Sequence, residues 1–170
     1  EHGIVDMTGR FNEPGDIDGP LGELVIKGDK DEPAFIIVKA ADSGTGHDIT
    51  MTQKDIRELQ LAKAALAAGI RILLDKAALK ADEVENLLLD GAFGNFIKKE
   101  SALRIGLFPG FKSEQIKFIG NAAGYGAIMM LLSGKELEHI CGINDVCEYV
   151  EVGALPDFQT YFADMMMFPE

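Results

Sequence analysis

The chain has few cysteines and a deficit of basic residues. Its 170 residues include two cysteines, Cys141 and Cys147, and no tryptophan. Two cysteines do not make a disulfide framework, so a reducing, cytoplasmic compartment is expected. Lys and Arg number 16 against 28 Asp and Glu, a formal net charge of −12. This charge repels phosphate backbones and anionic lipid, which argues against nucleic acid and membrane surfaces as partners.

The sequence also lacks any apolar run near the ~18 residues that a membrane-spanning helix needs. No basic stretch followed by an apolar one opens the chain, so no signal peptide is expected. Because the first residue is Glu1 and not Met, the sequence suggests a fragment or a processed chain. Its length suffices for one domain with a sizeable core.

The negative charge is concentrated near the N-terminus. Residues 1–33 contain nine acidic and three basic residues, a net charge of −6, which is half of the total. The segment also contains the turn-forming run from Asn12 to Asp16. We therefore expect residues 1–33 to be an acidic lead-in with little core, and residues 34–170 to form the folded lobe.

Apolar patterning predicts an α/β protein. The expected strands are 24–27, 34–40, 49–52, 86–90, 115–119 and 148–152, and the expected helices are 53–79, 98–105, 127–132, 135–143 and 156–167. The first three strands are close enough in sequence for an antiparallel meander, whereas the next two are connected by a helix. This order predicts a ribonuclease-H-like mixed sheet, with three antiparallel strands, helix-connected parallel strands and helices on both faces.

The helix expected over 53–79 has the clearest signals. Thr52 is placed to be its N-cap, with Asp55 three residues later in a capping-box arrangement. Gln60 and Lys63 lie one turn apart on this helix. They belong either to a solvated face or to a surface that contacts a ribose or phosphate, which makes Lys63 a lesser candidate for nucleotide binding.

Two glycine-rich loops follow predicted strands and precede helices. The candidate nucleotide-binding residues in them are Gly91, Ala92, Phe93, Gly94, Asn95, Gly120, Asn121, Ala122, Ala123, Gly124 and Gly126. Ligands of α/β sheets bind at the carboxyl ends of strands, where glycine permits close backbone approach and the next helix offers free N–H groups. The loops therefore favour one nucleotide-binding crevice, with close packing alone as the alternative. Neither loop is a P-loop or a dinucleotide fingerprint.

Other motifs favour structural roles. The run Asp42–Gly46 resembles a phosphate-binding hairpin but follows the second expected strand, so an ordinary turn is favoured. His139, Cys141 and Cys147 lack a fourth metal ligand, and buried structural thiols are expected. Asp90 is the one candidate for a kinase acid-base residue at a strand end, and such an acid is commonly structural.

Four segments in order resemble one family. Residues 52–65, 91–95, 120–127 and 156–159 are similar to the C-terminal part of the reductive activators of corrinoid proteins, and the likeness runs from about Phe35 to the end. That family is similar to the actin-like ATPases, which include acetate and sugar kinases, heat-shock chaperones and actin.

The resemblance implies ATP-dependent reduction of inactive Co(II) corrinoid proteins to Co(I), a step in one-carbon metabolism and methyl transfer. It implies ATP or ADP with Mg, and an iron–sulfur cluster in a domain outside this chain. The implied partner is a corrinoid iron–sulfur protein or a corrinoid methyl carrier, and a homodimer is a further expectation. The loop Gly91–Asn95 would lie on the adenosine side, with Gly120–Gly126 close to the nucleotide.

The sequence also departs from that family. It contains no cluster of cysteines for iron and sulfur, and no recognisable phosphate loop or water-activating acid. No catalytic residue is therefore assigned, and the isolated chain is not expected to be active. The alternative is a non-enzymatic module that docks a corrinoid protein or a second subunit.

Overall fold

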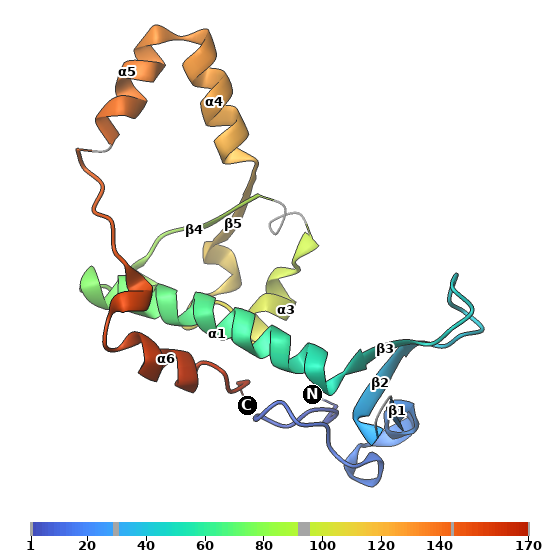
Figure 1. Ribbon diagram of the computed structural model, residues 1–170. Helices are drawn as coiled ribbons and strands as arrows, with labels where there is room; N and C mark the ends of the chain where they lie inside the picture. The colour runs from blue at the N-terminus through green and yellow to red at the C-terminus, as the bar shows by residue number, and fades with distance from the viewer. Residues whose placement is uncertain (1, 29–30, 92–95, 144, 170) are drawn as a thin grey trace. The chain divides into compact units, whose positions relative to one another are not determined.

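The computed structural model describes residues 2–28, 31–91, 96–143 and 145–169. The chain divides into two compact units, residues 1–68 with 160–170, and residues 69–159. Helix α1 (Gln53–Lys76) begins in the first unit and ends in the second (Figure 1). No helix among the described residues is long and apolar enough to cross a membrane.

The first unit contains the antiparallel meander that the sequence predicts. Strands β1 (Val25–Lys27), β2 (Pro33–Val38) and β3 (Ile49–Thr52) form a sheet in the order β1-β2-β3. Phe35 of β2 lies opposite both Val25 and Met51. The meander is local in sequence, because residues 28–32 connect β1 to β2 and residues 39–48 connect β2 to β3.

Helix α1 begins with the predicted capping box. The Thr52 hydroxyl accepts a hydrogen bond from the Asp55 N–H at 3.2 Å, and the Asp55 carboxylate accepts one from the Thr52 N–H at 2.8 Å. The helix ends at Lys76, three residues before the predicted end. There Ala78 is left-handed (φ +54°), and Leu79 N–H donates to the Leu74 carbonyl at 3.0 Å, which is a Schellman ending.

The two terminal segments of the chain meet in the first unit. Two short 3-10 helices, Pro14–Asp16 and Gly19–Leu24, punctuate the N-terminal segment, and α6 (Phe158–Asp164) precedes the C-terminal one. The Phe168 N–H donates a hydrogen bond to the Met7 carbonyl at 2.8 Å. Ile17 is buried, so the acidic lead-in contributes an apolar side chain to the interior.

The second unit contains a parallel pair of strands, β4 (Leu87–Asp90) and β5 (Ile116–Gly120), with α3 (Lys99–Arg104) between them in sequence. Its core is a cluster of buried side chains, namely Ala102, Phe108, Phe111 and Ile116. The C-terminal turns of α1 contribute Ile70 and Leu74 to this cluster. The core therefore fixes the strands whose ends form the candidate site.

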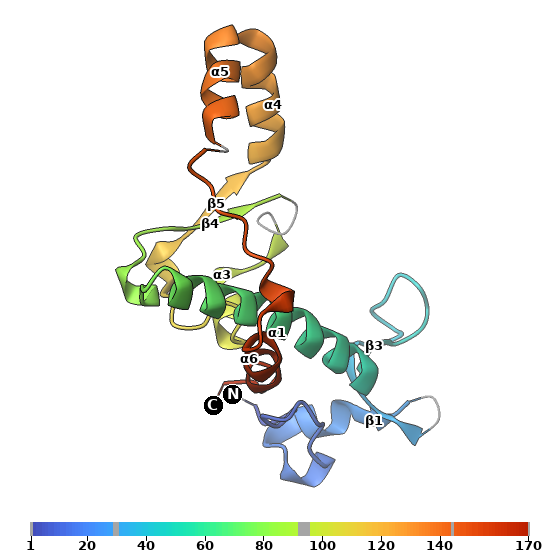
Figure 2. The ribbon, with the colours of Figure 1, turned by 60° about the vertical axis from the view of Figure 1, so that its left-hand side comes forward.

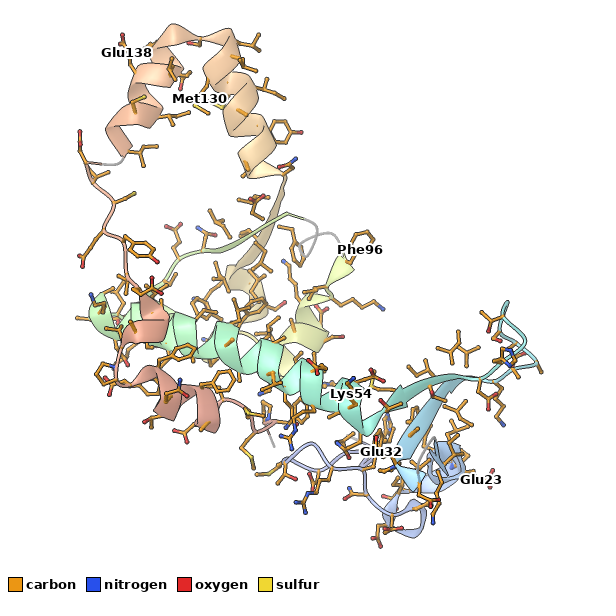
Figure 3. The ribbon with its side chains drawn as sticks, in the orientation of Figure 1. Glu23, Glu32, Lys54, Phe96, Met130 and Glu138 are labelled. Carbon is orange, nitrogen blue, oxygen red and sulfur yellow. The ribbon has the colours of Figure 1, made fainter. Side chains whose placement is uncertain are left out.

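Helices α4 (Ala122–Leu132) and α5 (Gly134–Ile143) form a hairpin after β5, and diverge from the turn that joins them (Figures 1 and 2). Met130 lies on the side of α4 that faces α5, whereas Glu138 lies on the outer side of α5 (Figure 3). Leu131 and Leu132 are 85% and 82% exposed. The hairpin thus displays apolar surface.

The structure confirms the α/β class, with antiparallel and parallel strands and helices. The described strands form two sheets, one in each unit, where the sequence suggested one mixed sheet. The expected strand over 148–152 is wrong. Residues 148–151 are irregular and Val152–Ala154 is a 3-10 helix. No strand among the described residues pairs with this segment to supply ladder hydrogen bonds.

Candidate functional site

The candidate site lies at the carboxyl ends of β4 and β5. The strands are parallel, with Leu87 opposite Ile116 and Asp90 opposite Gly120, so both end at the same edge. Gly91 (φ +77°) and Gly120 (φ +73°) turn the chain in the left-handed conformation that favours glycine. The Gly91 N–H donates a hydrogen bond to the Gly120 carbonyl at 2.7 Å, which joins the two turns directly.

Asp90 also joins the two turns. Its Oδ1 accepts a hydrogen bond from the Gly91 N–H at 2.7 Å and one from the Ala122 N–H at 2.7 Å. The β4–β5 register shifts between Leu89 and Asp90, an irregularity of the kind that re-aims side chains at strand ends. Of the two interpretations of Asp90, kinase acid or structural acid, these contacts favour the structural one.

Helix α4 starts within the segment that the sequence treats as a loop. The Asn121 side chain accepts a hydrogen bond from the Gly124 N–H at 2.9 Å and so caps the helix, which begins at Ala122 and not at residue 127. The expectation of a loop through Gly126 is therefore wrong, because the cap starts the helix two residues after β5. Ala123, Gly124 and Gly126 lie in its first turns.

The structure brings together Gly91 and the predicted residues from Gly120 to Gly126. The other predicted residues of the first loop, Ala92, Phe93, Gly94 and Asn95, lie outside the described residues. The site thus contains both strand ends and the first turns of α4. The sequence did not indicate that Asp90 joins the two turns, although an acid directly before a glycine turn is a usable signal.

Lys63 lies in the first unit with its ammonium group bonded within the chain. Its Nζ donates to the carbonyls of Met165 and Met167, at 2.6 Å each, and lies 5.2 Å from the centre of the Phe168 ring. The side chain is buried, and this burial lowers the pKa of Lys63. Because the ammonium already donates to these two carbonyls, the nucleotide site proposed below does not include Lys63.

Gln60 is buried beside Lys63, so the solvated face suggested for this pair is wrong. Its Nε2 donates to the carbonyls of Thr8 at 3.0 Å and Met166 at 2.9 Å. Two turns earlier, Gln53 donates to the Gly9 carbonyl at 2.6 Å. This face of α1 therefore binds backbone carbonyls of both terminal segments, because its amide and ammonium donors satisfy groups that would otherwise be unpaired.

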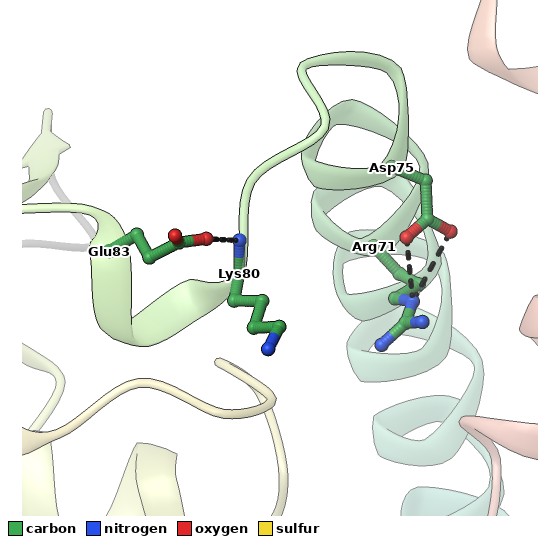
Figure 4. A network of polar contacts seen from close by, with 4 residues as sticks. All are labelled: Arg71, Asp75, Lys80 and Glu83. Carbon is green, nitrogen blue, oxygen red and sulfur yellow. Dashed lines mark hydrogen bonds and ion pairs between the residues drawn. The ribbon is translucent and has the colours of Figure 1, made fainter.

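A further polar network surrounds the end of α1 (Figure 4). Arg71 Nε lies 3.2 Å from a carboxylate oxygen of Asp75, and both side chains are largely exposed. The Glu83 carboxylate accepts a hydrogen bond from the Lys80 N–H at 2.7 Å and so caps the 3-10 turn Ala81–Glu83. These contacts close helix and turn ends and do not involve the strand-end site.

The remaining motifs give no metal site among the described residues. No group of three or more His, Cys, Asp or Glu side chains there could hold an ion. Cys141 and Cys147 are exposed free thiols, so the expectation of buried thiols is wrong. The run Asp42–Gly46 is held by local hydrogen bonds, such as that from the Ser43 hydroxyl to the carbonyl of the following residue, His47, at 2.6 Å. These bonds are those of an ordinary turn.

The whole chain, residues 1–170, matches the family described as the C-terminal domain of RACo, the ASKHA domain. The chain belongs to this family. An ASKHA domain implies nucleotide binding. The match confirms the resemblance to the actin-like ATPase domain of corrinoid-protein activators.

Individual relatives agree with the family. The chain is similar to the corrinoid activation enzyme RamQ of Eubacterium limosum, with 34% identity over 166 residues, or 96% of this chain and 28% of RamQ. It is 29% identical over 98 residues to the Co(II) methylated-amine-specific corrinoid protein reductase of Methanosarcina barkeri, covering 58% of this chain and 18% of that protein.

A solved structure, a reductive activator for corrinoid, iron–sulfur protein, superposes with a TM-score of 0.84 at 28% identity. The superposition covers 99% of this chain and 26% of that one. The matched parts therefore span only 28%, 18% and 26% of the length of these three relatives.

Proposed function

We propose that this chain binds ATP or ADP at the ends of β4 and β5, as the C-terminal part of an ATP-dependent reductive activator of corrinoid proteins. The observation that carries the proposal is the pairing of two left-handed glycine turns at adjacent parallel strand ends, joined by the 2.7 Å bond from Gly91 to Gly120. A Cβ added at Gly91 or Gly120 would meet no atom within 4 Å. Both turns therefore leave room at the edge where an α/β sheet binds its ligand.

The charge at this edge supports placing the adenosine side of the nucleotide there. The first helical amide of α4, that of Ala122, already donates to the Asp90 carboxylate, and the Gly124 amide donates to Asn121. A carboxylate at the positive end of a helix disfavours a second anion there. The neutral ribose and base suit this position, and the phosphates with their Mg lie beyond it, held by residues outside this chain.

The proposed reaction returns a Co(II) corrinoid protein to Co(I). The electron comes from an iron–sulfur cluster in a domain outside these residues, and ATP hydrolysis drives the transfer. The names of the relatives, a corrinoid activation enzyme, a corrinoid protein reductase and a reductive activator, support this assignment. Because the chain spans little of their length, we do not expect it to perform the reduction alone.

The nucleotide assignment is tested by adding bulk to the first turn of α4. Ala123 is exposed, and Ala123→Leu places a larger side chain beside the strand ends without removing a hydrogen-bond donor. Titration calorimetry of the full-length protein with Mg-ADP should show affinity at least about tenfold weaker, a change of about 1.4 kcal/mol. Ala127→Leu, one turn further from the strand ends, is the control and should bind ADP as before. Equal binding by both variants would contradict the site.

Docking of a corrinoid protein is the second candidate function. The exposed apolar residues of the α4–α5 hairpin favour it, since exposed apolar patches mark interaction surfaces. Leu131→Ser in the full-length protein should weaken capture of the purified Co(II) corrinoid protein, whereas Ile37→Ser, at a 53% exposed position outside the hairpin, should not. Unchanged capture by Leu131→Ser would remove this candidate, and dimer loss without loss of capture would assign the hairpin to a second subunit.

We also propose a cytoplasmic location. Cys141 and Cys147 are both exposed and free, and exposed free thiols persist in a reducing compartment. Labelling of these thiols in freshly lysed cells tests the proposal, because extensive oxidation there would contradict it.

A further inference from the structure

Asp90 contacts both glycine turns of the proposed nucleotide site through one carboxylate oxygen. It is the last residue of β4, and its side chain is exposed at the end of the strand. Its Oδ1 accepts hydrogen bonds from the Gly91 N–H and the Ala122 N–H, at 2.7 Å each. One oxygen thus holds the residue that follows β4 and the first residue of α4.

The backbone alone gives a weaker connection between the two turns. The Gly91 N–H donates to the Gly120 carbonyl, but this bond does not involve α4. The Ala122 N–H is an N-terminal helical donor, which has no partner within its own helix. Asp90 supplies that partner from the neighbouring strand, and so fixes where α4 begins relative to the turn at Gly91.

Two features make this contact strong for an exposed side chain. Hydrogen bonds from backbone N–H groups to an ionised carboxylate are about twice as strong as neutral ones. The carboxylate also lies at the positive end of the 11-residue helix α4, where a negative charge is favoured. Asn121 caps the same helix through Gly124, so the two side chains satisfy different amides of its first turn.

We propose that Asp90 is a positioning residue of the nucleotide site, which holds the β4 turn and the α4 N-terminus at the spacing that the nucleotide requires. This inference rests on the proposed nucleotide-binding function. It assigns no contact between Asp90 and the reacting phosphate. A bound nucleotide that touches both turns keeps its affinity only while their spacing is fixed, because a mobile site must be ordered on binding.

Three variants of the full-length protein separate positioning from general stability. Asp90→Ala removes both hydrogen bonds, Asp90→Asn keeps an Oδ1 acceptor without the charge, and Asp82→Ala removes an exposed carboxylate elsewhere in the second unit. Titration with Mg-ADP should show affinity about tenfold weaker for Asp90→Ala, within about threefold of the parent for Asp90→Asn, and unchanged for Asp82→Ala. Thermal unfolding of all three should stay close to that of the parent.

Amide hydrogen exchange without nucleotide gives a second, independent measurement. Exchange at Ala122 should accelerate in Asp90→Ala and stay slow in Asp90→Asn, whereas the Gly91 N–H keeps its bond to the Gly120 carbonyl in both variants. If the parent protein did not bind ADP at all, the proposed function would fail while the exchange result still tested the role of Asp90. Parent-like ADP affinity in Asp90→Ala, unchanged exchange, or an Asn variant as weak as the Ala variant would overturn the positioning role.

Discussion

Replacing Lys63 by Met should destabilise the first unit strongly, although no carboxylate pairs with this lysine among the described residues. The Lys63 side chain is 1% exposed, and its ammonium donates to two backbone carbonyls at 2.6 Å. Met keeps the length and apolar stem of lysine but cannot donate. The carbonyls of Met165 and Met167 then lose their donor inside the protein.

The magnitude follows from the groups left without partners. An orphaned buried acceptor costs about 1–3 kcal/mol, and loss of the contact with the Phe168 ring adds about 0.5–1 kcal/mol. The burial of the ammonium, which lowers the pKa of Lys63, is relieved in the variant and offsets part of this cost. We therefore expect the free energy of unfolding to fall by about 2–3 kcal/mol, which corresponds to a drop in Tm of roughly 4–12 °C.

Urea denaturation followed by far-UV circular dichroism measures the loss. Lys54→Met is the matched control, because Lys54 lies on the same helix with an exposed side chain, labelled in Figure 3. That control should stay within about 0.5 kcal/mol of the parent. Equal unfolding free energies for the two variants would refute the structural role of the Lys63 ammonium.

Three further predictions test the turns and caps. Ala78→Gly should raise the unfolding free energy by about 1 kcal/mol in urea denaturation, because φ at Ala78 is +54°, a conformation that glycine adopts without strain. Ala77 does not have a positive φ, so the control Ala77→Gly should not raise the unfolding free energy. Gly9→Ala should cost about 1–3 kcal/mol more than Gly3→Ala, since both have positive φ but only at Gly9 would a Cβ lie 2.5 Å from the Gln60 side chain; similar losses would contradict this packing. Hydrogen bonds from the Thr52 N–H and hydroxyl lower the pKa of Asp55 below 3.8 in the folded state. The stabilisation by Asp55 is therefore complete above that value and lost as pH falls through the lower folded pKa, so the Tm gap between the parent and Asp55→Ala should narrow in acid. A Tm difference between the parent and Asp55→Ala that did not change with pH would contradict the stabilising role of the Asp55 carboxylate.

Much of the local structure could be predicted from the sequence because its signals are local. The capping box of Thr52 and Asp55 and the apolar spacing after it predicted α1, and the short strands before it predicted the meander. The start of α4 was missed because Gly124 and Gly126 have low helix propensity, which the Asn121 cap and the Asp90 carboxylate overcome. The strand over 148–152 failed because strand formation requires a partner, which residue patterns within the segment do not supply.

By itself, the sequence determined the family resemblance, the acidic character and the two glycine turns, because each depends on residue identity and spacing along the chain. Only the tertiary structure decided what the polar side chains do. It placed Lys63 and Gln60 against backbone carbonyls that are more than 100 residues away in sequence. It also brought the Asp90 carboxylate to the Ala122 N–H, which is 32 residues away in sequence. A buried donor binds whichever acceptor the fold brings within hydrogen-bonding distance, and separation along the chain does not reveal that distance.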